Sequence, residues 1–178
     1  MNSINKEQPE NNHMDLSGNS AIEKLKELIE NNNTCFLCTS IVSGSSFSAR
    51  PMTVQKVDDD GYLWFLSAND SKQNAEIQED HAVQLLFQGT KTYDYLSLYG
   101  EAAITENKNK IKELWKPLLK AWFTEGEDDP RISVIKFMPH EGYYWDTKHN
   151  KLVSFIKIVA GAIIGKTLDD SIEGKILV

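Results

Sequence analysis

The sequence has little of what several large protein classes require. Only two of its 178 residues are cysteine, which excludes the disulfide framework of small secreted domains. Basic residues are in the minority, with 19 Lys and Arg against 26 Asp and Glu and a net charge of -7. Because phosphate backbones and anionic lipids need a basic surface, we expect neither nucleic acid nor a membrane as a partner.

Long hydrophobic runs are also missing. The most apolar stretch, residues 152–165, is too short to span a bilayer and contains Lys157. The polar, asparagine-rich start has neither the apolar core of a secretion signal nor the arginine pattern of an import signal. We therefore predict a disordered tail over residues 1–18, a single domain over residues 19–178 and a cytoplasmic location.

Several catalytic and metal-binding motifs are absent as well. The segment GAIIGKT is not a phosphate-binding loop, because the motif needs glycine where Ala160 stands. Neither G-x-G-x-x-G nor G-x-S-x-G occurs, and the four histidines have no metal-ligand spacing. Cys35 and Cys38 lie in a strand-like segment, where residues three apart point to opposite faces, so we expect core thiols. The sequence thus indicates no metal site and no catalytic residue.

What the sequence does contain is a series of short strands with helices at the periphery. The β-branched and aromatic runs predict strands over 34–42, 47–57, 62–67, 83–88, 93–105, 132–138 and 143–146. Helices are expected from a capping box at Ser20-x-x-Glu23 to residue 31, over 71–78, over 111–122 with a break at Pro117, and over 152–164. This order predicts a mainly β fold, a closed or half-closed antiparallel barrel.

One stretch combines the residue types that a flat, phosphate-bearing ligand needs. Arg50 lies in an expected strand and could offer a bidentate guanidinium. Ser71 and Lys72 open the next helix, where free N–H groups and the positive end of the helix suit a phosphate. The backbone of the strand at 62–67 could then meet the polar edge of a ring system.

An ordinary structural interpretation of these residues stays open. Arginine in a strand and a Ser-Lys pair at a helix start are common. Asp70 could simply be the residue that caps the helix, and its carboxylate would repel a phosphate. Spacing alone does not decide between a phosphate site and a capped helix.

At these residues the sequence resembles the general stress protein 26 group of the pyridoxamine 5′-phosphate oxidase-like FMN-binding split barrels. The resemblance covers residues 21–178 and rests on motifs in a matching order. These are Ala49-Arg50-Pro51-Met52, Trp64-Phe65-Leu66-Ser67, Ser71-Lys72, Tyr99-Gly100-Glu101-Ala102, Trp122-Phe123-x-x-Gly126-x-x-Asp129-Pro130 and Tyr144-Trp145-Asp146. It implies a six-stranded antiparallel split β-barrel that forms a homodimer, with FMN at the subunit interface.

The resemblance also assigns site residues. Arg50, Ser71 and Lys72 would hold the FMN phosphate, and Trp145 would approach the ring from the partner subunit, unless it is an ordinary core or interface tryptophan. The two strands along the ribityl chain and the ring would carry Pro51, Met52, Thr53, Phe65, Leu66 and Ser67.

Two differences from the sequences of true pyridoxamine phosphate oxidases bear on which reaction is expected. True pyridoxamine phosphate oxidases have lysine where this chain has Gln55, and an Arg-x-His segment that does not follow Trp145 here. These differences argue against the vitamin-producing oxidase reaction. The resemblance therefore implies a stress-associated flavin-dependent oxidoreductase whose small-molecule substrate the sequence does not name. A non-catalytic flavin carrier or sensor, and an interaction module with a vestigial flavin site, are the alternatives.

Overall fold

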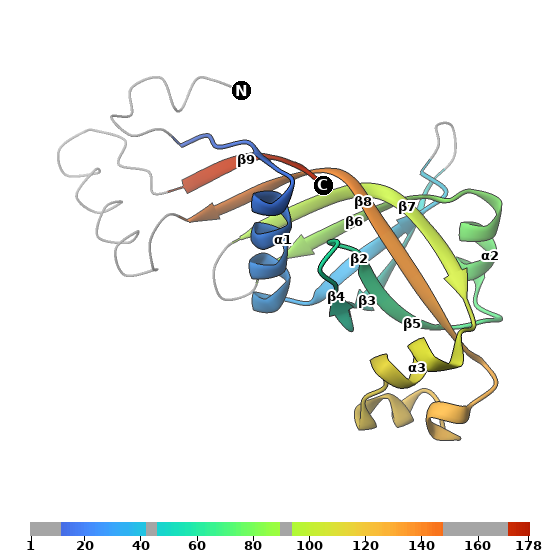
Figure 1. The fold of residues 1–178 in the computed structure, drawn as a ribbon. Coiled ribbons are helices and arrows are strands. Elements are labelled where there is room, and N and C mark those ends of the chain that lie inside the picture. The colour runs from blue at the N-terminus through green and yellow to red at the C-terminus, as the bar shows by residue number, and fades with distance from the viewer. Residues whose placement is uncertain (1–11, 42–45, 90–93, 148–170) are drawn as a thin grey trace, which may run out of the picture.

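The strands of the chain form one curved sheet with helices at its ends (Figure 1). The computed structural model describes residues 12–41, 46–89, 94–147 and 171–178. Its strands are β1 (Leu16–Ser17), β2 (Thr34–Thr39), β3 (Ser48–Thr53), β4 (Lys56–Val57), β5 (Leu63–Ala68), β6 (Ala82–Gln88), β7 (Tyr95–Thr105), β8 (Ile132–Thr147) and β9 (Ser171–Leu177).

The sheet is organised around the long strand β8. One edge of β8 pairs with β7, whereas the other pairs first with β5 and then, beyond residue 140, with β9. From β7 the order continues through β6 and β2 to β3. Every pair is antiparallel except β1 with β9.

The barrel is split where the chain changes its pairing partner. Val54 N–H donates to the Asn33 carbonyl beside β2, at 2.8 Å, while Gln55 N–H donates to the Trp64 carbonyl of β5, at 2.8 Å. As a result β3 pairs with β2 and β4 pairs with β5, and within the described chain β3 and β5 do not pair with each other. The predicted mainly β split barrel is confirmed, although the described sheet has nine strands rather than six, among them the two-residue strands β1 and β4 and the edge strand β9.

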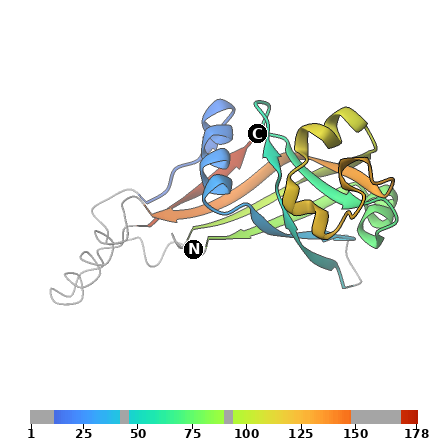
Figure 2. The ribbon, with the colours of Figure 1, turned by 90° about the horizontal axis from the view of Figure 1, so that it is seen from below.

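In the described ranges, three α-helices lie around the sheet: α1 (Asn19–Asn31), α2 (Lys72–Glu79) and α3 (Lys108–Leu114). Helices α1 and α2 lie at opposite ends of the barrel, and α3 lies with the 3-10 helices Pro117–Ala121 and Gly126–Asp128 below it (Figures 1 and 2). The apolar stripe of α1 packs on barrel residues whose side chains alternate inward. The shared core includes Leu25, Leu28, Ile29, Leu37, Leu63, Phe65, Leu85, Leu98 and Phe137. None of the helices in the described ranges could cross a membrane.

Two of the predicted elements differ in the structure. The predicted capping box does not form, because Gly18 is the N-cap with a φ of 57° and the Ser20 hydroxyl instead donates to the Ser17 carbonyl at 2.9 Å. The strands predicted at 132–138 and 143–146 are one strand, β8. The register with β7 shifts between Tyr99 and Gly100, where His140 of β8 is the extra residue, and Pro139, whose missing N–H would interrupt a regular ladder, lies next to this bulge.

The remaining predicted elements include one confirmed break, one strand that divides in two, and parts that lie outside the described residues. The predicted break at Pro117 is confirmed, since α3 ends at Leu114 and a 3-10 helix begins at the proline. The strand predicted at 47–57 divides into β3 and β4 at the change of partner. The helix predicted at 152–164 and the strand ends at residues 42 and 93 lie outside the described residues.

The N-terminal segment lies along the edge strand β9. The sequence predicts a disordered tail to residue 18, but residues 12–17 instead follow β9, with Leu16 opposite Ile176. The buried Tyr144 hydroxyl donates to the Met14 carbonyl at 2.9 Å. Residues 1–11 lie outside the described chain.

Gly174 provides a test of this arrangement. A Cβ at Gly174 would overlap the Met14 carbonyl, a backbone atom that no side-chain rotation can move aside. We expect Gly174→Ala to release residues 12–17 from β9 and to lower the free energy of unfolding by about 1–3 kcal/mol. Hydrogen exchange of residues 12–18 and urea unfolding measure both effects. Lys175→Ala is the control, and unchanged exchange in Gly174→Ala would contradict the close approach.

Candidate functional site

Three elements bring polar side chains together around one carboxylate. Arg50 points inward from β3, where its Nη1 lies 2.8 Å from the Glu76 carboxylate of α2 and donates to the Thr39 hydroxyl of β2 at 3.1 Å. Thr39 in turn donates to Glu76 at 2.6 Å, and the Ser48 hydroxyl donates to its other oxygen at 3.1 Å. The side chain of Glu76 is only 11% exposed. We refer to Thr39, Ser48, Arg50, Lys72 and Glu76 as the Glu76 cluster.

The donors of this cluster keep Glu76 ionised. Burial raises the pKa of a carboxyl, but the hydrogen bonds from Arg50, Thr39 and Ser48 and the charge of Arg50 outweigh burial here. Together they lower the pKa of Glu76 to about 2. The carboxylate is therefore a fixed negative charge at neutral pH.

The residues expected to bind phosphate meet at this cluster. Lys72 Nζ lies 3.5 Å from Glu76, and its side chain is 78% exposed. Ser71 is the N-cap of α2 and accepts from Asn74 N–H at 3.3 Å, so the alternative in which Asp70 caps the helix is wrong. The structure thus brings Arg50 and Lys72 to one carboxylate and places Ser71 beside Lys72 at the helix start.

Sequence reasoning missed Glu76. The i,i+4 spacing of Lys72 and Glu76 on α2 is a signal that could have drawn attention to Glu76, because this spacing favours an ion pair, and the pair forms. Nothing in the spacing indicates that Glu76 turns toward β2 and β3, where it meets Arg50 instead of water. That arrangement depends on how α2 packs against the barrel.

Arg50 keeps part of its hydrogen-bonding capacity. Both of its contacts use Nη1, and within the described residues Nε and Nη2 have no hydrogen-bond partner. The side chain is 23% exposed, so this unused edge can be reached from solvent. A guanidinium edge with two N–H groups matches two oxygens of a phosphate.

The β5 residues of the predicted site have buried side chains. Phe65 lies in the barrel core and Leu66 packs under α3. Ser67 shares hydrogen bonds with Asn74 and Ser133, at 2.8 and 2.9 Å. Of these three residues, only the backbone can meet a ligand.

The backbone of Leu66 points into the split. The Trp64 carbonyl accepts from Gln55, so the polar groups of Trp64 face away from β8. Strand geometry repeats every second residue, which turns the N–H and C=O of Leu66 to the same side. β4 begins at Lys56, opposite Trp64, so within the described strands none pairs with Leu66 on that side.

Of the remaining predicted site residues, residues 51–53 lie on the two faces of β3, and Trp145 lies near the end of β8. Met52 faces inward and its sulfur accepts from Gln73 Nε2 at 3.5 Å, whereas Pro51 and Thr53 are exposed on the outer face. Trp145 is 42% exposed and its ring lies 4.7 Å from that of Tyr143.

An apolar groove of about 770 Å³ runs across the outer face of the sheet and joins Pro51 to Trp145. Its exposed apolar side chains come from five neighbouring strands. They are Pro51 of β3, Phe36 of β2, Leu86 of β6, Tyr95 of β7 and Trp145 of β8. We refer to this surface as the outer groove.

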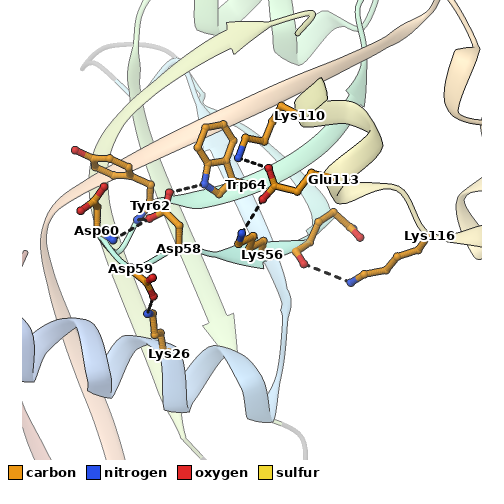
Figure 3. A network of polar contacts seen from close by, with 11 residues as sticks. Lys26, Lys56, Asp58, Asp59, Asp60, Tyr62, Trp64, Lys110, Glu113 and Lys116 are labelled. Carbon is orange, nitrogen blue, oxygen red and sulfur yellow. Dashed lines mark hydrogen bonds and ion pairs between the residues drawn. The ribbon is translucent and has the colours of Figure 1, made fainter. Parts of the chain in front are cut away.

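We refer to α3 and the 3-10 helices Pro117–Ala121 and Gly126–Asp128 as the arm. The arm contacts the strands at the end of the split. Glu113 of α3 accepts from Lys56 and Lys110, both at 2.6 Å, and Lys110 lies 4.4 Å from the Trp64 ring (Figure 3). Lys116 donates to the Gln55 carbonyl at 3.4 Å. The arm covers the outer face of β5, so the split is bounded by β3, β5 and the arm.

The two cysteines lie in the core, although Cys35 also borders the outer groove. Cys35 and Cys38 are free thiols and both are buried, which confirms the prediction of core thiols. Burial, with a smaller contribution from Cys38, raises the pKa of Cys35 to about 12. Within the described ranges, no three metal-ligating side chains come together.

Comparison with known proteins gives a consistent set of similarities. Residues 20–169 match the family model described as pyridoxamine 5′-phosphate oxidase like. The protein bli-3 of Neurospora crassa is 23% identical over 154 residues, which cover 82% of this chain and 74% of bli-3.

Solved structures share the fold. A protein of Jannaschia sp. CCS1 assigned as general stress protein 26 aligns with a TM-score of 0.74 and 20% identity, over 90% of this chain and all of that chain. A general stress protein of Xanthomonas citri, described as FMN/FAD binding, aligns with a TM-score of 0.62 and 23% identity, over 73% of this chain and 91% of that chain.

The low pKa of Glu76 predicts a specific acid sensitivity. The folded pKa of about 2 lies below the ordinary value of 4.5, so the stabilisation is present above pH 4.5 and is lost as the pH falls toward 2. We expect Glu76→Gln to be less stable at pH 7 and to lose less stability across this range than the wild type. Urea unfolding at several pH values measures this slope. Glu79→Gln, an exposed position on the same helix, is the control, and equal slopes in Glu76→Gln and wild type would contradict the assignment.

Proposed function

Because this chain belongs to the pyridoxamine 5′-phosphate oxidase-like family, we propose that it binds FMN and acts as a flavin-dependent oxidoreductase on a small molecule. The observation that carries this proposal is the meeting of Arg50 and Lys72 beside the split of the barrel. In a chain with a net charge of -7, an anionic cofactor needs such a local pair of cations.

The FMN phosphate fits the Glu76 cluster. Arg50 would bind it through the free Nε and Nη2 edge, and the exposed Lys72 would close on it from α2. The helix start at Ser71 adds the backbone N–H groups of the first turn of α2. The Xanthomonas citri protein, described as FMN/FAD binding, supports a flavin as the ligand.

The flavin ring would lie along the split. The N–H and C=O of Leu66 face this side, which suits the polar edge of an isoalloxazine. Pro51 and Thr53 would flank the ring from the outer face of β3, and Met52 would support it from within. Phe65 and Ser67 would contribute by fixing the backbone of β5.

The bound flavin would supply the redox chemistry by accepting and returning electrons. The protein then needs to bind the phosphate, orient the ring and restrict access of water, which explains why no catalytic side chain stands out. We also propose a role in the stress response, which the general stress protein relatives support. A cytoplasmic location agrees with two cysteines that remain free thiols.

The phosphate assignment predicts which residues hold the flavin. We expect the double variant Arg50→Ala and Lys72→Ala to lose at least about 100-fold in FMN affinity, because both charge-assisted contacts disappear. Fluorescence titration with FMN measures the affinity, and circular dichroism checks the fold.

The exposed pair Lys112→Ala and Lys120→Ala makes the same change in net charge and is the matched control. Stoichiometric FMN in the Arg50 and Lys72 double variant would show that the phosphate lies elsewhere.

We further propose that a second copy of this chain covers the outer groove. Its apolar side chains, with Phe36 54% exposed and Leu86 and Trp145 each 42% exposed, form a continuous patch that water would otherwise contact. A two-fold contact here would place Trp145 of one subunit near Pro51 of the other. The flavin would then lie at the interface of a homodimer.

A charge in the outer groove tests this assembly. We expect Leu86→Glu to yield a monomer, because a buried unpaired carboxylate at the centre of the contact is costly. It should also weaken FMN binding, since the partner would no longer cover the ring. Light scattering after size-exclusion chromatography gives the oligomeric state.

Leu118→Glu, on an exposed 3-10 helix outside the groove, is the control and should remain a dimer. A Leu86→Glu protein that stays dimeric would contradict the interface, as would a monomer with undiminished FMN affinity.

A further inference from the structure

We infer that Glu76 is a built-in counter-anion, which fixes Arg50 in place and limits how tightly the cluster holds a phosphate group. The identity of the phosphate-bearing ligand rests on the proposed function, whereas the opposition between Glu76 and a bound phosphate rests on the geometry of the cluster. As a consequence, the site would bind and release the phosphate-bearing ligand reversibly rather than hold it permanently.

The first observation is that Glu76 lies between the two cations. One carboxylate oxygen meets Arg50 at 2.8 Å and Thr39 at 2.6 Å. The other meets Ser48 at 3.1 Å and Lys72 at 3.5 Å. Two hydroxyl groups and two cations around two oxygens are the surroundings that a bound anion would have.

The second observation concerns charge. Arg50 and Lys72 carry two positive charges, and the ionised Glu76 cancels one of them. Because Glu76 is largely buried, solvent screens its effect on a neighbouring phosphate only in part. Each negative charge on the phosphate is therefore repelled by the same residue that positions Arg50.

The third observation is an asymmetry between the two ion pairs. Arg50 is held firmly through Nη1 by Glu76 and Thr39, and its other edge stays open. Lys72 is exposed and makes the longest contact of the cluster. A phosphate can thus draw Lys72 away and use the open edge of Arg50, while Glu76 stays bound to Arg50, Thr39 and Ser48.

The variant Glu76→Gln distinguishes the effect of Glu76 on the position of Arg50 from the effect of its negative charge. Its carbonyl oxygen can still accept from Arg50 and Thr39, and its amide can donate to the Ser48 hydroxyl. Glu76→Gln therefore keeps the geometry and removes the negative charge. Glu76→Ala removes both, so it should not gain the full affinity of Glu76→Gln.

The experiment compares three probes on the full-length chain freed of bound flavin: FMN, riboflavin and inorganic phosphate. Calorimetric titration of Glu76→Gln should show about tenfold tighter binding of FMN than the wild type, with riboflavin unchanged because it carries no phosphate. Inorganic phosphate should show the same preference for the variant. Glu79→Gln, with an equal change in charge, should bind all three probes as the wild type does.

A Glu76→Gln protein that binds FMN and phosphate no tighter than the wild type would overturn the inference. If phosphate binds more tightly to the variant but FMN binds to neither protein, the inference stands and the proposed function fails. If FMN binds both proteins equally, the proposed function stands and the inference fails. If no probe binds either protein, both are wrong.

A measurement on the wild type does not depend on the variant folding. Carbon-detected NMR can follow the titration of the Glu76 carboxyl with and without saturating FMN. A phosphate held next to Glu76 should raise the pKa of Glu76 from about 2. An unchanged titration midpoint in the presence of bound FMN would contradict the inference.

Discussion

The rest of the structure depends on the change of strand partner within residues 48–57. Between Val54 and Gln55 the backbone stops pairing beside β2 and starts pairing with β5. This exchange leaves β3 and β5 unpaired with each other and opens the barrel. The exchange leaves the backbone of Leu66 facing the gap, while the alternation of β3 directs Arg50 toward Glu76 of α2. A cation and a strand edge without a partner among the described strands therefore border the same opening.

The Glu76 cluster shows how one interaction can serve both the fold and a ligand. The carboxylate joins α2 to β2 and β3 through Thr39, Ser48 and Arg50, so it stabilises the packing of α2 on the barrel. The same contacts hold the guanidinium with one edge free. Glu76 positions Arg50 by binding one edge of its guanidinium. The negative charge of Glu76 also acts on any ligand that binds the other edge.

Much of the fold could be predicted from the sequence, because the inward-facing positions of strands such as β7 are apolar and turns separate the strands. Arg50, Ser71 and Lys72 could also be brought together, since a strand and the start of a helix carry them. The position of Glu76 could not be predicted, because it depends on the rotation of α2 against the barrel. The burial of Leu66 depends on α3, which covers the outer face of β5. The pairing of residues 12–17 with β9 was missed because this polar segment is held largely through backbone contacts and has no strand pattern of its own.

The most direct test of the account is to identify the small molecule that the purified chain releases on denaturation. A phosphate site beside the split predicts a flavin carrying one phosphate, close to one per chain, detected by mass spectrometry and by the absorbance of the yellow protein. Its release should leave a chain that takes up FMN again after refolding. A flavin without a phosphate, or a folded chain that neither carries a flavin nor takes one up, would contradict the central claim that Arg50 and Lys72 form a phosphate site beside the split.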